Sequence, residues 1–354
     1  MIEIIKEKEK WDTILGTMDQ YDFYHTYDYQ HISKNIEEEP VLIHYTEGNR
    51  SIALPLLLRS IADTPYMDAT SVYGYAGPLT CNIDNDFDNT NFKNQLLAFF
   101  KKNNLVAVFS RLHPYIPIQQ LVLKNMGEVT VMGKIVNVDL TKNLESQKKE
   151  YQKRLRTYIN KERNVYTIIG SKTESDVLKF IDLYYENMRR VNADSNYFFK
   201  KEYFFGLLKS EDFKTDLLLA RCNDSNEIVG GAMFIKKNNI VQYHLSGAKE
   251  EYLNLNPIKV LIDEARINAT NENYTYFNLG GGKGGKEDSL FRFKAGFSKD
   301  FWIFSVWKYI INKDAYDGLV QKTLINVPKD LHKDYLAYFP HYRSPGQTKL
   351  PYDL

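Results

Sequence analysis

The stretch YTYFNLGGGKGGKEDSLFRFKAGFSKDFWIFSVWKYI, residues 274–310, decides the fold. It is typical of a short strand, a glycine-rich loop, a short helix around residues 289–295 and an aromatic strand. Upstream lie a helix with an apolar face, three strand-forming runs between residues 216 and 247, and a helix that begins at Pro257. This order predicts an α/β (α+β) domain with a mixed, mostly antiparallel sheet flanked by helices.

The N-terminal part predicts a second α/β domain. PVLIHYTEGNRSIALPLLLRS, residues 40–60, reads as a hairpin that turns at Glu47-Gly48-Asn49. The segment Tyr66 to Leu79, rich in Tyr, Gly and Pro, predicts a rigid irregular loop. A helix around residues 91–102 then leads to the apolar strand at 105–109.

A strongly charged helix is predicted from Leu144 to Arg163, with seven basic and two acidic residues within 148–163. A chain of 354 residues exceeds what one core usually supports. We therefore place the domain junction here, which gives an N-terminal domain at 1–145 and a C-terminal domain at 146–354.

Composition excludes several classes of protein. Hydrophobic residues make up 43% and charged residues 26%, and the net charge of +1 gives no general attraction to DNA. No apolar run approaches the roughly 20 residues that span a bilayer, and the N-terminus lacks an export signal, so we expect a cytoplasmic protein. Cys81 and Cys222 are too few for a disulfide framework.

The sequence GGGKGGK at 280–286 has two familiar interpretations that fail. A dinucleotide-binding turn needs an acidic residue closing the next strand, and a P-loop needs a Ser or Thr where Glu287 stands. Two interpretations remain, a loop that holds a phosphate or carboxylate through backbone N–H groups and lysines, or an ordinary surface loop. The residues of this candidate anion site are Gly281, Gly282, Lys283 and Lys286.

Two candidate catalytic residues lie in the C-terminal domain. Lys294, in FRFKAGF, is flanked by aromatic residues and is suited to stabilising negative charge, with Arg292 as a second donor; the alternative is a short helix that leaves both cations in solvent. His244, in VQYHLSG, is suited to accepting a proton from an amine, or else is a buried sheet histidine. HExxH and GxSxG motifs are missing, which argues against zinc and serine hydrolases.

Further polar candidates lie elsewhere in the chain. Asp68, Tyr73 and Tyr75, in YMDATSVYGYAGP, put a carboxylate and two hydroxyls on a stiff loop that either binds a polar substrate or forms a packed turn. Arg189 lies at the end of a predicted helix, where it either meets an anionic substrate or complements the helix dipole.

Five segments in this order resemble the FemAB/FemX-type peptidoglycan aminoacyltransferases and their GNAT-like acyltransferase relatives. They are PLLLRS, YMDATSVYGYAGPL, YHLSGAKEEYLNLNPIKVLIDEARINA, FNLGGG and FRFKAGF. The resemblance implies two GNAT-like domains, an acceptor amine on a muramyl peptide and an aminoacyl-tRNA donor, with no cofactor or metal. It further implies that Lys294 and the glycine loop lie near the donor, and that Tyr73 and Tyr75 face a cleft between the halves. A lipid-linked acceptor would add peripheral membrane contact.

One segment departs from ordinary acyl-CoA enzymes of this kind. Where they carry a glycine-containing pyrophosphate loop, this chain has AKEEYLNLN, residues 248–256. This favours aminoacyl-tRNA as the donor. The basic helix at 148–163 either contacts tRNA phosphates or is an ordinary solvated helix face, and no inserted helical arm lies between Arg163 and Val177. Two alternatives stay open, an acyl-CoA enzyme acting on a sugar amine or small metabolite, and an inactive scaffold that binds a precursor.

Overall fold

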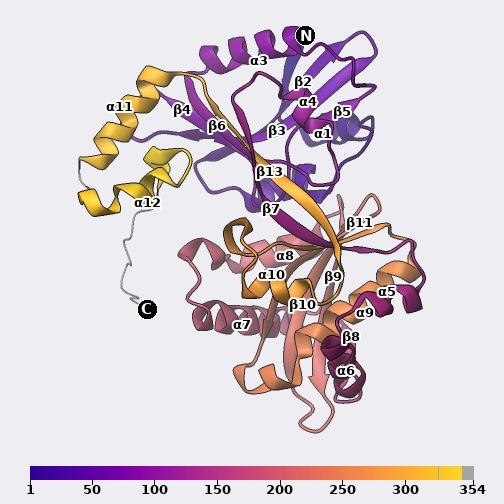
Figure 1. The fold of residues 1–354 in the computed structure, drawn as a ribbon. Coiled ribbons are helices and arrows are strands. Elements are labelled where there is room, and N and C mark those ends of the chain that lie inside the picture. Colours follow the sequence, from indigo (N-terminus) through magenta and orange to yellow (C-terminus); the bar gives the residue numbers. More distant parts are fainter. Residues whose placement is uncertain (326, 345–354) are drawn as a thin grey trace. The chain divides into compact units, whose positions relative to one another are not determined.

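The computed structural model describes residues 1–325 and 327–344, which form two compact units (Figure 1). Of the described residues, the first unit comprises 1–20, 34–131, 305–325 and 327–344, and the second comprises 21–33 and 132–304. Each unit is thus assembled from separate stretches of chain. Strands β7 and β13 each begin in one unit and end in the other.

The strands are β1 Ile2–Ile5, β2 Glu38–Glu47, β3 Arg50–Ser60, β4 Met67–Thr70, β5 Leu79–Cys81, β6 Leu105–Arg111, β7 Glu128–Asp139, β8 Tyr166–Gly170, β9 Lys214–Cys222, β10 Ile228–Lys237, β11 Ile240–Ala248, β12 Tyr276–Gly280 and β13 Asp300–Ile310. The α-helices are α1 Lys8–Leu15, α2 Tyr27–Ser33, α3 Thr90–Lys102, α4 Gln119–Val122, α5 Leu144–Glu150, α6 Lys153–Glu162, α7 Glu174–Arg190, α8 Lys201–Lys209, α9 Pro257–Asn271, α10 Ser289–Lys294, α11 Lys313–Leu324 and α12 His332–Leu336. Short 3-10 helices include Phe23–His25, Glu250–Leu255 and Lys283–Gly285. Within residues 1–325 and 327–344, no helix is long and apolar enough to cross a bilayer.

The first unit is built on a sheet with the strand order β1-β2-β3-β4-β6-β13, and β5 pairs with β3. The predicted hairpin is confirmed, since β2 and β3 pair from Glu38↔Arg59 to Glu47↔Arg50. Gly48 turns the chain with φ 59°, a value that glycine adopts without strain. β4 pairs with β6 in parallel, and the C-terminal half of β13 pairs antiparallel with β6.

The second unit has the strand order β7-β12-β11-β10-β9-β8. Helices α7 and α9 cover opposite faces of this sheet (Figure 1). A Cβ added to Gly231 would lie 2.5 Å from the ring of Phe180 on α7, whereas one added to Gly230 would lie 2.9 Å from Pro257 on α9. Adjacent glycines on β10 therefore let a helix approach closely from each side. Only β11 and β12 pair in parallel, so the predicted mixed, mostly antiparallel sheet flanked by helices is confirmed.

A segment from near the N-terminus, residues 21–33, completes the second unit. The carboxylate of Asp22 accepts a hydrogen bond of 2.6 Å from Gln242 on β11, and both side chains are buried. The ring of Phe23 packs 5.5 Å from that of Phe213. We call residues 21–33 the N-terminal strap, because they cover the face of β11 on which Gln242 lies.

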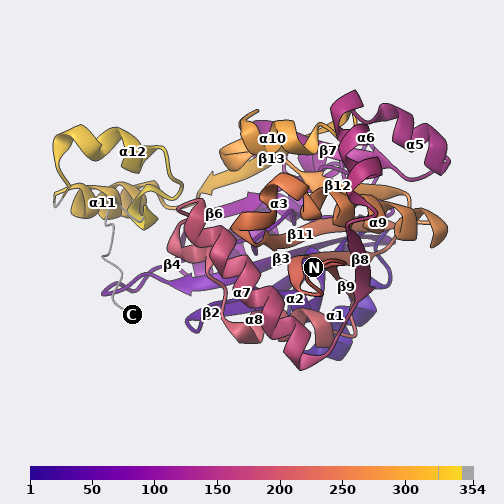
Figure 2. The same cartoon turned by 90° about the horizontal axis from the view of Figure 1, so that it is seen from below.

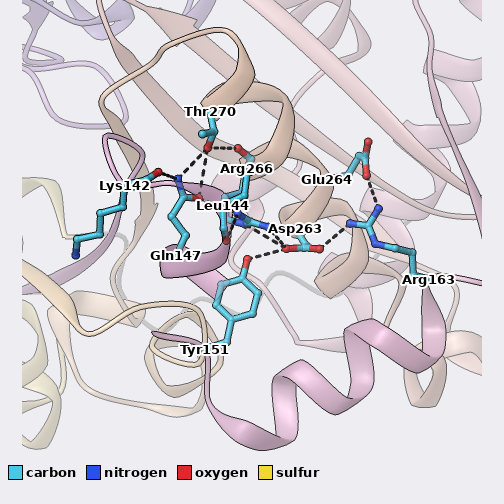
Figure 3. A network of polar contacts seen from close by, with 9 residues as sticks. All are labelled: Lys142, Leu144, Gln147, Tyr151, Arg163, Asp263, Glu264, Arg266 and Thr270. Carbon is cyan, nitrogen blue, oxygen red and sulfur yellow. Dashed lines mark hydrogen bonds and ion pairs between the residues drawn. The ribbon is translucent and has the colours of Figure 1, made fainter. Parts of the chain in front are cut away.

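Helices α5, α6 and α9 are joined by a buried polar network (Figure 3). Asp263 on α9 accepts hydrogen bonds from the Tyr151 hydroxyl at 2.8 Å, from Arg163 at 2.6 Å and from Arg266 at 2.8 Å. Arg266 also donates to Gln147 at 2.8 Å. These contacts hold α5 and α6 against α9.

Two local predictions need correction. The helix expected from Leu144 to Arg163 is two helices, α5 and α6, because Tyr151 and Gln152 are extended and Gln152 N–H donates to Gly296 O at 2.9 Å. The segment predicted to be irregular from Tyr66 onward contains the strand β4, which lies between β3 and β6. In both places a contact with a distant segment outweighs the local preference.

Candidate active site

A gap opens between β11 and β12 in the second unit. The two strands pair only from Ile240 to Gln242 and from Tyr276 to Asn278. β11 then continues to Ala248 and β12 to Gly280, and no further pair joins them within the described residues. Diverging neighbours leave backbone groups without strand partners, so this edge is suited to holding a polar group.

His244 lies on β11 at a β-bulge beside this gap. Met233 and Phe234 on β10 pair with Leu245 and Tyr243, which leaves His244 as the extra residue. Such a bulge bends the strand and redirects the side chain. Two residues after Gln242, His244 lies on the face of the sheet that the N-terminal strap covers.

The surroundings of His244 keep its imidazole neutral. The rings of Phe23 and Tyr29 meet it edge-on at 5.6 and 6.1 Å. Burial lowers the pKa of His244 to about 3. Its Nε2 lies 2.7 Å from the hydroxyl of Tyr203, which lies 3.3 Å from the hydroxyl of Tyr29. A neutral imidazole linked to hydroxyls can accept a proton from a reacting amine.

Lys294 lies in the last turn of α10, on the other side of the gap. Its side chain is buried, and Nζ donates to the carbonyl oxygen of Gly281 at 2.8 Å. A Cβ on Gly280, whose φ is 77°, would lie 3.1 Å from Nζ, so glycine makes room for the ammonium. Burial lowers the pKa of Lys294 to about 8, against the opposing charge of Asp288. The group therefore remains mostly protonated at neutral pH and can stabilise negative charge.

The two candidate catalytic residues approach the gap from opposite faces of the sheet. Phe291 and Ala295 of α10 belong to the same core cluster as Leu155 on α6 and Val260 on α9. Figure 2 shows α10 on the side of α6, and α7 and α8 on the other side. His244 instead contacts Tyr203 of α8. A base on one face and a cation on the other suit a reaction between substrates that arrive from both sides.

The glycine loop is fixed by its own side chains. Asp288 caps α10 through Phe291 N–H at 2.9 Å and accepts Lys283 N–H at 3.0 Å. A carboxylate of the chain therefore occupies the place where a P-loop would hold phosphate. Lys283 and Lys286 are exposed, and Lys134 forms an ion pair of 2.9 Å with Glu287. Gly281 and Gly282 provide close packing, because an added Cβ would lie 2.6 Å from Lys134 O and 2.0 Å from Lys286 O respectively.

The remaining candidates are Asp68, Tyr73 and Tyr75 in the first unit, and Arg189 and Arg292 in the second. Asp68, in the first unit, is buried with its two carboxylate oxygens 2.7 Å from Arg59 Nε and 2.8 Å from Arg343 Nε. Tyr73, in the same unit, is 41% exposed, with the Arg111 guanidinium 5.7 Å from its ring. The other candidates are the partly buried Tyr75, the exposed Arg189 in the last turn of α7, and the exposed Arg292, which donates to Glu287 O at 3.3 Å. Their substrate-binding roles stay predictions.

Sequence reasoning missed the partners of His244 and a row of buried amides beside the gap. Tyr203 and the N-terminal strap are far from His244 in the chain, so no motif connects them. The amides are Gln242, Asn278 and Asn137, each fully or almost fully buried. Their only signal in the sequence is a polar residue inside an otherwise apolar strand run.

The chain is similar in fold to proteins of known structure. Residues 146–294 match the sequence model of the family described as "Acetyltransferase (GNAT) domain". FemX, known from a crystal structure, is 13% identical with a TM-score of 0.68, over 89% of this chain and 99% of FemX. A conserved protein of unknown function from Bacteroides thetaiotaomicron is 12% identical with a TM-score of 0.58, over 87% of this chain and 100% of that protein. No protein with a curated function matches. The chain therefore has the fold of FemX, which confirms the fold expected from the resemblance to the FemAB/FemX-type family.

Proposed function

We propose that the chain is a GNAT-type acyltransferase that moves an aminoacyl group from an aminoacyl-tRNA to an amine of a peptidoglycan precursor. The single observation that carries this proposal is the approach of His244 and Lys294 to the β11–β12 gap from opposite faces. The GNAT domain match and the FemX fold support the class of reaction. The choice of donor and acceptor follows the resemblance to FemX-type enzymes, and a cytoplasmic location is part of the proposal.

The chemistry requires few steps. The acceptor nitrogen attacks the ester carbonyl carbon, forming an N–C bond and moving an electron pair onto the carbonyl oxygen. Lys294 stabilises this oxyanion. The electron pair on the oxyanion then re-forms the carbonyl double bond. The bond from the carbonyl carbon to the ester oxygen breaks, and an amide remains. The proton lost by the nitrogen passes through His244 to the departing oxygen, so protons balance. Positioning of the two substrates supplies the rest of the rate.

An acyl-CoA donor is the second candidate, because the matched family is described by acetyl transfer. The segment before α9 argues against it. Residues 250–255 form a 3-10 helix, and the N–H groups of Tyr252 and Asn256 donate to Lys249 O and Leu253 O. A pyrophosphate needs such N–H groups free. The basic α6 offers exposed Lys153 and Arg154 to tRNA phosphates, whereas Arg163 is engaged with Asp263.

A thermal-shift experiment tests donor and acceptor separately. We expect a UDP-linked muramyl pentapeptide to raise the melting temperature, because a ligand at 100 times its Kd adds about 2.7 kcal/mol. A shift with coenzyme A alone would replace the proposal by the acyl-CoA alternative. Binding of the precursor with no transfer from charged tRNA or acetyl-CoA would identify a scaffold without turnover.

The pH dependence of transfer should report Lys294. We expect kcat to fall above about pH 8, approaching tenfold per pH unit, because burial lowers the pKa of Lys294 to about 8 and the neutral amine stabilises no oxyanion. Because burial lowers the pKa of His244 to about 3, we expect this residue to contribute no titration to the profile between pH 5 and 7. In Lys294→Arg, whose guanidinium stays charged, the residual rate should lose the alkaline fall. An unchanged alkaline fall in that variant would assign it to another group.

A further inference from the structure

Three amide side chains form a row across the second unit, beside the β11–β12 gap. Gln242 on β11 pairs with Asn278 on β12, and Asn278 pairs with Asn137 on β7. Paired residues on adjacent strands point to the same face of a sheet. The row lies on the face opposite α9, because the neighbouring Val241 and Phe277 point into the core cluster that contains α9.

The outer two amides have acceptors and the central one does not. Gln242 Nε2 donates to Asp22 at 2.6 Å, and Asn137 Nδ2 donates to Asp300 at 2.6 Å. Asn278 is 0% exposed, and its Nδ2 has no hydrogen-bond partner. Its Oδ1 accepts the N–H of Gly280 at 2.7 Å. That contact fixes the orientation of the amide. If the amide were flipped, its NH2 group would face the N–H of Gly280, and its Oδ1 would be left without a donor.

An unpaired donor at a fully buried position destabilises the resting protein. Burying an amide N–H without an acceptor forfeits its hydration, whereas an apolar side chain of the same shape carries no such penalty. Asn278 is also the last residue of β12 that pairs with β11, and it lies three residues before Gly281, whose carbonyl oxygen Lys294 contacts. A donor without an acceptor at this place is suited to form a hydrogen bond with an oxygen that is present only during the reaction.

We propose that Asn278 Nδ2 donates a hydrogen bond to the carbonyl oxygen of the group being transferred. This inference rests on the proposed acyl transfer and adds a second oxyanion donor to it. Lys294 contributes a charged donor from the side of α10, and Asn278 contributes a neutral donor from the face with His244. As the carbonyl carbon becomes tetrahedral, the oxygen gains charge and both hydrogen bonds strengthen.

Two variants with matched chemistry separate this role from a structural one. Asn278→Leu removes the unpaired donor, and Gln242→Met removes a donor that already has an acceptor. We expect Asn278→Leu to keep a urea midpoint close to that of the wild type, because the lost contact to Gly280 N–H is offset by the removed penalty. Gln242→Met should lower the midpoint clearly, because it removes the 2.6 Å hydrogen bond that Oδ2 of the buried Asp22 accepts from Gln242.

Transfer is measured with alanyl-tRNA or acetyl-CoA, whichever the wild type uses, and the UDP-linked muramyl pentapeptide. Asn278→Leu and Asn278→Asp should lower kcat by roughly 10²- to 10³-fold with a small change in KM, because the lost bond forms in the transition state. Asp is included because it retains the acceptor for Gly280 N–H. Unchanged kcat in both variants, or a midpoint loss in Asn278→Leu equal to that of Gln242→Met, would overturn the inference. The urea midpoints are measured without substrate, so they test the unpaired donor of Asn278 independently of the reaction. A wild type without turnover would instead contradict the proposed function.

Discussion

Replacing Lys294 by alanine should lower kcat by roughly 10²- to 10³-fold with little change in KM, because one preorganised donor to the developing oxyanion is lost. Its ammonium is buried, held 2.8 Å from Gly281 O, and remains mostly protonated at neutral pH with a pKa of about 8. Such a group is worth more to a transition state than an exposed lysine, because little water screens its charge. Single-turnover rates at saturating acceptor give the measurement.

The matched control for this variant is Arg292→Ala. Arg292 lies on the same helix, but it is exposed and donates a hydrogen bond of 3.3 Å to Glu287 O. We expect its kcat to stay within about twofold of the wild type, since an exposed cation is screened by solvent. Equal losses in both variants would point to damage to α10, and an unchanged rate in Lys294→Ala would remove the assigned oxyanion donor.

Replacing Asp263 by alanine should lower the free energy of unfolding by about 3–5 kcal/mol, because removing one member of a buried ion pair leaves its partner charged and unpaired. Arg266, its partner at 2.8 Å, is 2% exposed, and the Tyr151 hydroxyl loses its acceptor in the same variant. Urea denaturation followed by circular dichroism measures the loss.

Glu264→Ala is the control, because Glu264 forms its ion pair of 2.8 Å with the partly exposed Arg163. We expect it to cost at most about 1 kcal/mol. Similar losses in the two variants would show that the network of Figure 3 contributes no more than a surface pair.

The acid stability of the protein should depend on the same residue. Burial alone would raise the pKa of Asp263, but the charge of Arg266 and hydrogen bonds from Arg163, Arg266 and Tyr151 outweigh it and lower the pKa. A carboxylate with a lowered pKa contributes its full stability above its unfolded pKa of about 3.9, and this is lost as the pH falls through the folded value. The stability difference between the wild type and Asp263→Ala should therefore shrink below about pH 4.

Local elements of the fold follow from the sequence where a short-range signal is present. Asn238 and Asn239 both have positive φ, 41° and 64°, at the predicted turn between β10 and β11. Pro257 opens α9 as expected, because its missing N–H would have had no partner there. Helix α3 and strand β6 match their expected ranges closely, because alternating and helical apolar patterns are local.

Contacts between distant segments are what the sequence could not supply. The pairing of Val306 with Arg111 returns the last strand to the first unit, and the N-terminal strap reaches β11 from more than two hundred residues away. The candidate site shows the same division. Lys294 and His244 could be proposed from their neighbours in sequence, whereas Tyr203 and Asn278 acquire a role only through tertiary contacts or register.

The placement of the N-terminal strap has a consequence for synthesis on the ribosome. Residues 21–33 are made early, yet the unit they complete extends to residue 304, and the first unit receives its last strand from residues 305–310. At translation rates of about 5–20 residues per second, the strap waits on the order of tens of seconds for its partners. Neither unit can finish folding before β13 is made, and Phe23 and Tyr29 lack their contacts with Phe213 and His244 until those two residues have been made. A nascent chain of this protein is therefore expected to engage chaperones that shield apolar side chains until β13 has been made.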